Sequence, residues 1–266
     1  MPASPSTRSG AESGRRSYAW LIAAALIAAL AFVVMALPAS LAARFLPRDV
    51  QASEPGGTLW HGSVAELSSH GRSLGAAEWR VHPASLLTGK LAASVRWVRQ
   101  DLSVDAELII AGKELIANSV RGGGSLESLA NFGMTRGWNG KLRIHIATFT
   151  LAEGKVRAAA GEIHLDGLSS TDFPGVDFGG ATLTFGPEAV QNDGTAIAQV
   201  SDAGSGPLQL SGTLTLAPAQ SLATFSGKLK QREPLPGDLQ QKINELAQMR
   251  GRDAQGRIAL DIEFVL

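Results

Sequence analysis

The sequence lacks cysteine altogether and is poor in aromatic and charged residues. Its 266 residues include 6% aromatic and 18% charged residues, whereas roughly a quarter of an average soluble domain is charged. The absence of cysteine excludes a disulfide scaffold, a thiolate metal site, a cysteine nucleophile and a lipidated cysteine. The 24 basic and 24 acidic side chains cancel, so the basic excess typical of nucleic-acid binders is missing. The high net charge that marks disordered chains is missing too.

One long apolar run is present, at residues 18–37. At about 1.5 Å per residue, a helix of this length spans about 30 Å, the thickness of a hydrocarbon core. Three arginines and one glutamate precede the run, and a positive flank favours a cytoplasmic N-terminus. We therefore predict a single-pass protein of the bacterial inner membrane. A cleaved signal peptide is the alternative, although the run is longer than the apolar part of most signal peptides. The predicted domains are a cytoplasmic tail (1–17), a transmembrane helix (18–37) and a periplasmic β-rich domain (38–266).

Apolar and polar residues alternate through much of the periplasmic region, which is typical of strands with one buried face. Gly212 interrupts one of these stretches, and we expect a bend or a bulge there. A helix is predicted at 239–250 with Asp238 as its cap, and single helical turns are predicted at 85–88 and 125–130. The alternation is found at 91–97, 102–110, 142–146, 163–165, 208–216 and, most clearly, 256–266.

The fold class that follows is mainly β. We expect one N-terminal transmembrane helix and then a large, mostly antiparallel curved sheet with a few short helices. The sequence leaves open whether this sheet forms a sandwich, an open barrel or an open trough.

Motifs for catalysis and nucleotide binding are missing from the sequence. It contains no Gly-x-Ser-x-Gly elbow, no phosphate-binding loop, no His-Glu-x-x-His helix and no EF-hand. The glycines at 122–124 fit neither nucleotide-binding pattern, so we expect a flexible connection there. His145 and His164 could form a metal set with Glu162 or Asp166, but solvated histidines on an exposed face are the favoured interpretation. We predict no enzymatic activity, no catalytic residue, no metal and no cofactor.

Two further patterns leave alternatives open. Trp60, Trp79, Trp97 and Trp138 fall at strand-like positions, and we expect them in the sheet core, with a surface facing lipid or a partner as the alternative. Residues 158–227 contain seven acidic residues and no Lys or Arg. This stretch is either a solvated face or an acidic docking surface, for a basic partner or for the chain's own basic half.

Two short motifs carry a family resemblance. They read Gly-x-Leu-Trp-x-Gly and Trp-x-x-x-Pro-x-x-Leu-Leu-x-Gly, and together with the membrane anchor and the length of the chain they resemble the type II secretion system protein N family (general secretion pathway protein N). The glycines suit bends or close approaches, and the leucines suit a core. The motif residues are Gly57, Leu59, Trp60, Gly62, Trp79, Pro83, Leu86, Leu87 and Gly89.

The resemblance implies an accessory inner-membrane component of the type II protein secretion system. Such a protein would act through protein–protein interaction in the periplasm, with other secretion components as its partners and no nucleic acid. The alternative is a lipid-handling or lipid-transfer module like the periplasmic AsmA proteins, in which a curved sheet holds acyl chains against its apolar face.

Overall fold

The computed structural model describes residues 36–41, 50–132, 137–186 and 188–265. In these residues thirteen strands form one antiparallel sheet in which the strands follow one another in chain order. The strands are β1 (Val50–Gly57), β2 (His61–Ser69), β3 (Arg72–His82), β4 (Leu91–Arg99), β5 (Leu102–Ala111), β6 (Glu114–Ser125), β7 (Trp138–Ala152), β8 (Lys155–Ser170), β9 (Phe173–Phe185), β10 (Ala196–Asp202), β11 (Leu208–Ala217), β12 (Leu222–Gln231) and β13 (Ile258–Val265).

The helices of the described residues are short and few. They are the α-helix α2 (Gly237–Arg250) and the 3₁₀ helices η2 (Pro83–Thr88), η3 (Leu126–Phe132) and η4 (Pro218–Gln220). The predicted final strand and the predicted helix at 239–250 are thus confirmed, although Asp238 lies in the first turn of α2 and makes no cap hydrogen bond.

The predicted transmembrane run lies almost wholly outside the described residues, which include only its last two positions, Ala36 and Leu37. Among the helices that the structure describes, none combines the length and the apolar character needed to cross a membrane.

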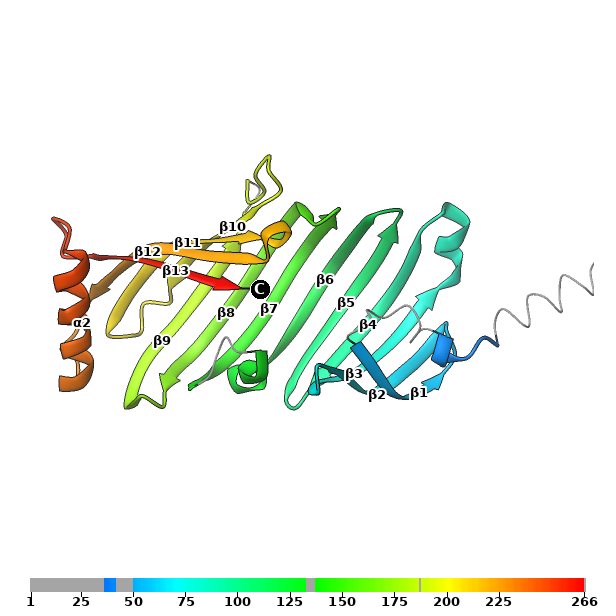
Figure 1. The fold of residues 1–266 in the computed structure, drawn as a ribbon, viewed down its shortest axis with the longest axis horizontal. Helices are drawn as coiled ribbons and strands as arrows, with labels where there is room; N and C mark the ends of the chain where they lie inside the picture. Colours follow the sequence, from blue (N-terminus) through cyan, green and yellow to red (C-terminus); the bar gives the residue numbers. More distant parts are fainter. Residues whose placement is uncertain (1–35, 42–49, 133–136, 187, 266) are drawn as a thin grey trace, which may run out of the picture.

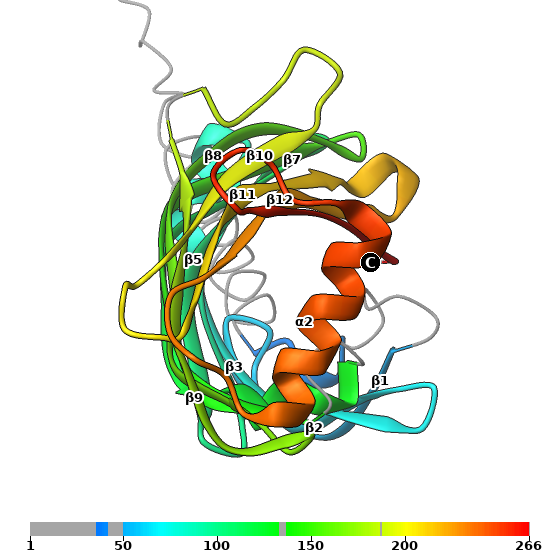
Figure 2. The same ribbon diagram turned by 90° about the vertical axis from the view of Figure 1, so that its left-hand side faces the viewer.

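The sheet is a single open, curved layer, with β1 and β13 as its two edges (Figures 1 and 2). Of the shapes left open by the sequence, the structure shows the open curved sheet. Strands β10 to β13 fold back in front of the middle strands, and α2 lies across the open side at the β13 end (Figure 2). One face of the sheet is therefore concave and the other convex.

The concave face is mostly apolar, although the buried Arg99 of β4 lies on it beside Trp97. Leu239 and Ile243 of α2 pack in one cluster with Ile258 and Leu229, and α2 lies on the inner side of the curve (Figure 2), so these strand residues mark the concave face. Because cross-strand partners share a face, the register extends this face through every strand from β2 to β13. One such row, which contains no polar side chain, is Val64, Ala77, Trp97, Val104, Gly122, Ile144, Ile163, Leu183, Val200, Gly212, Gly227 and Leu260.

The convex face is polar, because successive residues of a strand point to opposite faces. The neighbouring row of cross-strand partners contains only polar side chains, and its first half alternates in charge. This row is Ser63, Glu78, Arg96, Asp105, Arg121, His145, Glu162, Thr184, Gln199, Thr213, Ser226 and Asp261. Along these two rows, one face of the sheet is thus apolar and the other is polar.

The buried core lies in the later strands. One cluster of buried residues joins β7 to β10 around Val156, Phe185 and Ala198, and a second lies under α2. Neither cluster includes a residue of β1 to β5. Apart from Val64 and Leu102, which are buried, the apolar face of the first strands is therefore part of the sheet but not of its core.

One prediction about glycines is wrong, and a second is wrong in one of its two alternatives. Residues 122–124 are part of β6 and not a flexible connection; a Cβ on Gly124 would lie only 2.4 Å from the Cα of Leu102, so these glycines allow close packing of β6 on the start of β5. Of the bend or bulge expected at Gly212, the bulge is absent, because the register of β11 with β12 has no shift there. A Cβ there would lie 3.0 Å from the ring of Phe225, so Gly212 makes room for that ring.

The expectation that four tryptophans lie in the sheet core is also wrong. Trp60, Trp79 and Trp97 are half-buried, and Trp138 is 38% exposed. Trp79 and Trp97 lie on the concave face, in register with Gly62 and Ala77. Their rings line a surface instead of filling a closed interior.

Candidate functional site at the β1 end of the sheet

The first family motif forms the turn between β1 and β2. Gly57 has a φ of +80°, a left-handed conformation that suits glycine. The amide of Thr58 donates to the carbonyl of His61 at 2.9 Å, and the amide of His61 donates back to the Thr58 hydroxyl at 3.1 Å. The motif therefore sets the shape of this turn, residues 57–62.

Trp79 of β3 holds the turn from the neighbouring strand. Its indole Nε1 donates to the carbonyl of Leu59 at 2.9 Å, and the amide of Val81 donates to the carbonyl of Trp60 at 2.7 Å. Gly62 lies directly against the indole, because a Cβ on it would be 2.5 Å from Cζ2 of Trp79. The spacing between the two motifs thus reflects direct contact: the tryptophan of the second motif binds the turn made by the first.

The turn also binds the chain that follows the predicted membrane helix. The amide of Leu59 donates to the carbonyl of Leu37 at 2.8 Å, and Pro38 forms an isolated antiparallel bridge with Thr58. Ala39 is only 1% exposed. The described residues 36–41 are therefore fastened to the sheet through the same turn.

The rest of the second motif forms η2, the connection from β3 to β4. Pro83 begins it, and Gly89 ends it with a φ of +72° and an amide that donates to the carbonyl of Leu86. Leu86 is 45% exposed and Leu87 is 90% exposed. The expectation that these leucines supply core area is wrong, since η2 holds both of them toward solvent.

The motif residues therefore separate into two groups at one end of the sheet. Gly57, Leu59, Trp60, Gly62 and Trp79 come together around the turn that binds residues 36–41. Pro83, Leu86, Leu87 and Gly89 form η2 at the end of β3, which lies at the same, β1 end of the molecule (Figure 1). The contacts of the first group identify a structural role, whereas the second group exposes two leucines to solvent.

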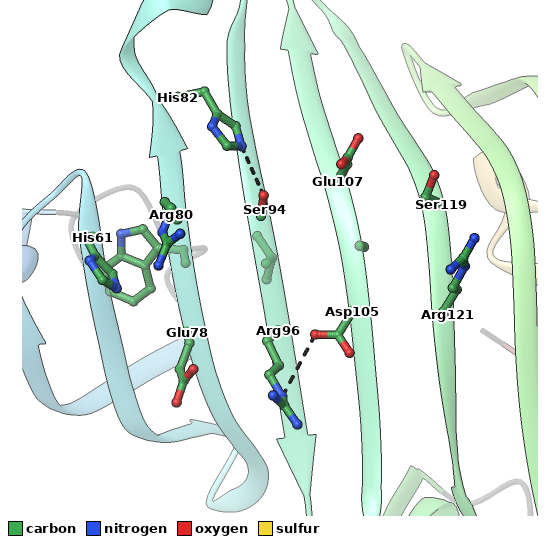
Figure 3. A pocket seen from close by; sticks show the side chains of 13 residues that line it. His61, Glu78, Arg80, His82, Ser94, Arg96, Asp105, Glu107, Ser119 and Arg121 are labelled. Atoms are coloured by element: carbon green, nitrogen blue, oxygen red, sulfur yellow. Dashed lines mark hydrogen bonds and ion pairs between the residues drawn. The ribbon is translucent and has the colours of Figure 1, made fainter.

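A depression of about 570 Å³ lies on the convex face, a short distance along the same strands. Figure 3 shows the side chains that line it, from β2 to β6. Three acidic and three basic residues alternate across it, and two histidines also line it. These charged residues are Glu78, Arg80, Arg96, Asp105, Glu107 and Arg121.

The sequence-based reasoning missed this surface. The signal was present, because each of β3 to β6 carries a charged residue at its convex positions. It becomes visible only when the register places Glu78, Arg96, Asp105 and Arg121 in one row.

The polar groups of the depression are exposed and form few contacts with one another. Arg96 and Asp105 approach to 3.9 Å, with their side chains 57% and 61% exposed, and such exposed pairs contribute little to stability. His82 Nε2 and the Ser94 hydroxyl lie 3.0 Å apart, the geometry of a base and a nucleophile. However, the pair stands on an open face that does not exclude water, and among the described residues no carboxylate is found on the other ring nitrogen of His82.

Of the candidate metal residues, His164 and Glu162 contact each other and Asp166 binds an arginine. His164 lies 3.1 Å from a Glu162 oxygen and 3.1 Å from the Thr182 hydroxyl, while Asp166 accepts two hydrogen bonds from Arg143. Nowhere in the described part of the chain do three His, Asp or Glu residues gather as a metal site would require.

The acidic stretch 158–227 is partly neutralised within the chain. Asp166 pairs with Arg143 from the basic half, and Asp202 pairs with Arg232. In the loop before β10, the backbone amide and the hydroxyl of Thr195 hold the pKa of Asp193 below its usual value. Contact with the chain's own arginines thus accounts for part of the acidic pattern.

Comparison with known proteins agrees with this arrangement. The family described as "Type II secretion system (T2SS), protein N" matches residues 48–261. A type II secretion system protein N from Vibrio cholerae serotype O1 is 39% identical over 69 residues, which is 25% of this chain and 27% of the Vibrio protein. No solved structure matches the chain. Since the family match covers nearly the entire sheet, including both motifs, the chain belongs to the type II secretion system protein N family.

Proposed function

We propose that this protein is an accessory component of the type II secretion system that is anchored in the inner membrane and acts through protein–protein contact in the periplasm. The observation that carries the proposal is the family match over residues 48–261. The fastening of Leu37 to Leu59 supports the anchored arrangement. In this arrangement the sheet begins where the predicted helix 18–37 leaves the membrane, with the N-terminus in the cytoplasm.

The convex depression is the surface best suited to a secretion partner. Arg96 and Arg121 present exposed guanidinium groups, and Glu78, Asp105 and Glu107 present carboxylates on the neighbouring strands. Alternating charges of this kind favour one register of a complementary partner and disfavour others. The partners that we propose are other components of the same secretion system.

Gene deletion and complementation test this function. In a bacterium that carries this gene, deletion should leave secreted proteins in the periplasm, and the full chain should restore their release. The double variant Arg96→Glu with Arg121→Glu should restore release poorly, because it turns an alternating row into a run of four carboxylates. Arg157→Glu, an exposed arginine of β8 outside the depression, is the matched control and should restore release fully.

The measurement is the ratio of secreted protein in the medium to that in the periplasm. Equal amounts of each variant in the membrane fraction would show that the change affects contact and not folding. Normal release after deletion would contradict the proposed function, and full restoration by the double variant would exclude the depression as the contact surface.

A further inference from the structure

The concave face of β3 to β6 is apolar but not covered by another layer of the described chain. Val95, Leu108 and the two tryptophans of this face are only half-buried. Ile110 and Leu115 are 46% and 40% exposed. We call this surface the open concave face and define it by Trp79, Val95, Trp97, Leu108, Ile110 and Leu115. Exposed apolar surface of this extent, backed by a continuous sheet, indicates a binding surface.

The open concave face offers no polar group to a ligand. The indole Nε1 of Trp79 already donates to the carbonyl of Leu59, and that of Trp97 donates to the carbonyl of Leu74 at 2.7 Å. The backbone amides and carbonyls of these strands are used in the sheet. What remains at the surface is hydrocarbon and ring carbon, which can bind an apolar chain but cannot orient a polar molecule.

The position of this face within the chain indicates which apolar molecule it meets. The apolar run 18–37, of membrane-spanning length, ends at Leu37, and the amide of Leu59 donates to the carbonyl of Leu37. Leu59 in turn accepts from Trp79, a residue of the open concave face. Two successive hydrogen bonds thus connect the end of the predicted anchor to this face. At the same end of the sheet η2 exposes Leu86 and Leu87 (Figure 1).

We propose that the open concave face binds the acyl chains of membrane phospholipids. The face is apolar like the chains, runs across several strands, and begins where the chain enters from the predicted bilayer. Binding would cover apolar surface of the sheet that α2 and β10 to β13 leave uncovered. The inference rests on the membrane anchor of the proposed function, but not on a role in secretion.

Neighbouring residues on opposite faces provide the test. The photoreactive amino acid p-benzoylphenylalanine is placed singly at Val95 or Leu108, on the concave face, and at Ser94 or Glu107, on the convex face. The full chain is expressed in cells grown with radioactive phosphate and irradiated before any detergent is added. We expect radioactive phospholipid on the protein at Val95 and Leu108, several-fold above the level at Ser94 and Glu107.

A third position separates failure of this inference from failure of the anchor. The same amino acid at Leu26, inside the run 18–37, should be labelled wherever the helix lies in a bilayer. Label at Leu26 without label at Val95 and Leu108 would overturn the inference and leave the anchor in place; absence of label at all positions would overturn both.

Two other outcomes would also overturn the inference. Equal label on the two faces would mean contact with the bilayer surface and not a bound chain. A crosslink from Val95 to a polypeptide, without phospholipid, would mean that a segment of another protein covers the face.

Discussion

Strands β7 to β13 and strands β3 to β6 share one sheet and one pattern of alternation, yet the buried members of the two core clusters include no residue of the latter. In the later strands Val156 and Ala198 are fully buried, whereas Ile110 and Leu115 in the earlier strands are 46% and 40% exposed. The two regions therefore differ in what covers the concave face and not in how the strands are built. A continuous apolar row is enough to make a sheet, but not to make a core.

The size of the concave side chains contributes to this difference. Gly212 and Gly227 lie opposite each other in β11 and β12, and Cβ atoms on them would lie 3.0 and 2.5 Å from the ring of Phe225. The small residues leave room for one ring to cover both positions. The open concave face carries two indole rings instead, and both remain half-buried. We therefore expect stability to be concentrated in the covered region.

The largest expected effect is the loss of a ring in the covered region. Phe185 is 7% exposed and belongs to the main core cluster, so Phe185→Ala should lower the free energy of unfolding by about 3–5 kcal/mol. Leu108→Ala on the open concave face should cost only about 1 kcal/mol, because its side chain is half-buried. Urea unfolding of the full chain measures both. Equal costs would mean that the two regions are equally packed.

A similar loss is expected when α2 no longer covers its end of the sheet. Leu239 is 5% exposed against Ile258 and Leu229, and Leu239→Ala should cost about 2–4 kcal/mol and increase the binding of a hydrophobic dye. Met249 of the same helix is 77% exposed, and Met249→Ala should change stability by less than about 0.5 kcal/mol. Dye binding that stayed unchanged in Leu239→Ala would show that α2 does not shield the concave face.

A smaller effect is expected at the turn that binds residues 36–41. In Gly62→Ala the new methyl would lie 2.5 Å from the Trp79 ring and 2.7 Å from the carbonyl of Thr58, and overpacking of this kind costs about 1–3 kcal/mol. Displacement of the indole should also change the tryptophan fluorescence. Gly186→Ala, where nothing lies within 4 Å of the new methyl, is the control and should leave the spectrum unchanged.

The strands and the two-faced character of the sheet were predictable, because both follow from local alternation. The final strand illustrates this: its alternation predicts the face on which Ile258 and Leu260 lie, and the register with β12 places them there. Curvature and covering were not predictable, since they depend on contacts between residues far apart, such as those of α2 with Val176 in β9. For the same reason residues 122–124 looked like a loop, although their lack of side chains serves close packing within β6.

The motif residues could be found from the sequence, but their roles could not. Nothing local to Gly62 indicates that the Trp79 ring lies against it, and the pair Leu86–Leu87 has the composition of a core segment. Its exposure results from η2, in which the Ser85 hydroxyl donates to the carbonyl of His82 and accepts from the amide of Ala92. The convex depression was missed because its charges come from four different strands.

Acid should weaken the connection from α2 to β13 through Asp253. Four groups donate hydrogen bonds to this carboxylate and hold its pKa well below the usual range. In order of decreasing effect they are the amide of Arg257, the guanidinium of Arg257, the amide of Gln255 and the ammonium of Lys228. Because the folded-state pKa is the lower one, the contribution to stability is complete above about pH 4, the pKa of an unfolded Asp, and is lost as the pH falls further. Urea midpoints measured at decreasing pH should therefore fall less steeply below about pH 4 in Asp253→Asn than in the parent chain. An identical slope in both proteins would exclude this contribution.

The smallest effect on stability is expected at the tip of η2, where the uncovered region meets the proposed bilayer. Leu87 is 90% exposed, so Leu87→Ser should change the free energy of unfolding by less than about 0.5 kcal/mol. In the proposed orientation, however, this side chain lies at the end where acyl chains enter, and its loss should reduce phospholipid labelling at Val95. Met249→Ser changes a similarly exposed apolar residue of α2, the helix at the opposite end of the sheet (Figure 1), and should leave that labelling unchanged. A marked loss of stability in Leu87→Ser would show that η2 supports the fold, and equal labelling in both variants would show that lipid reaches the open concave face by another route.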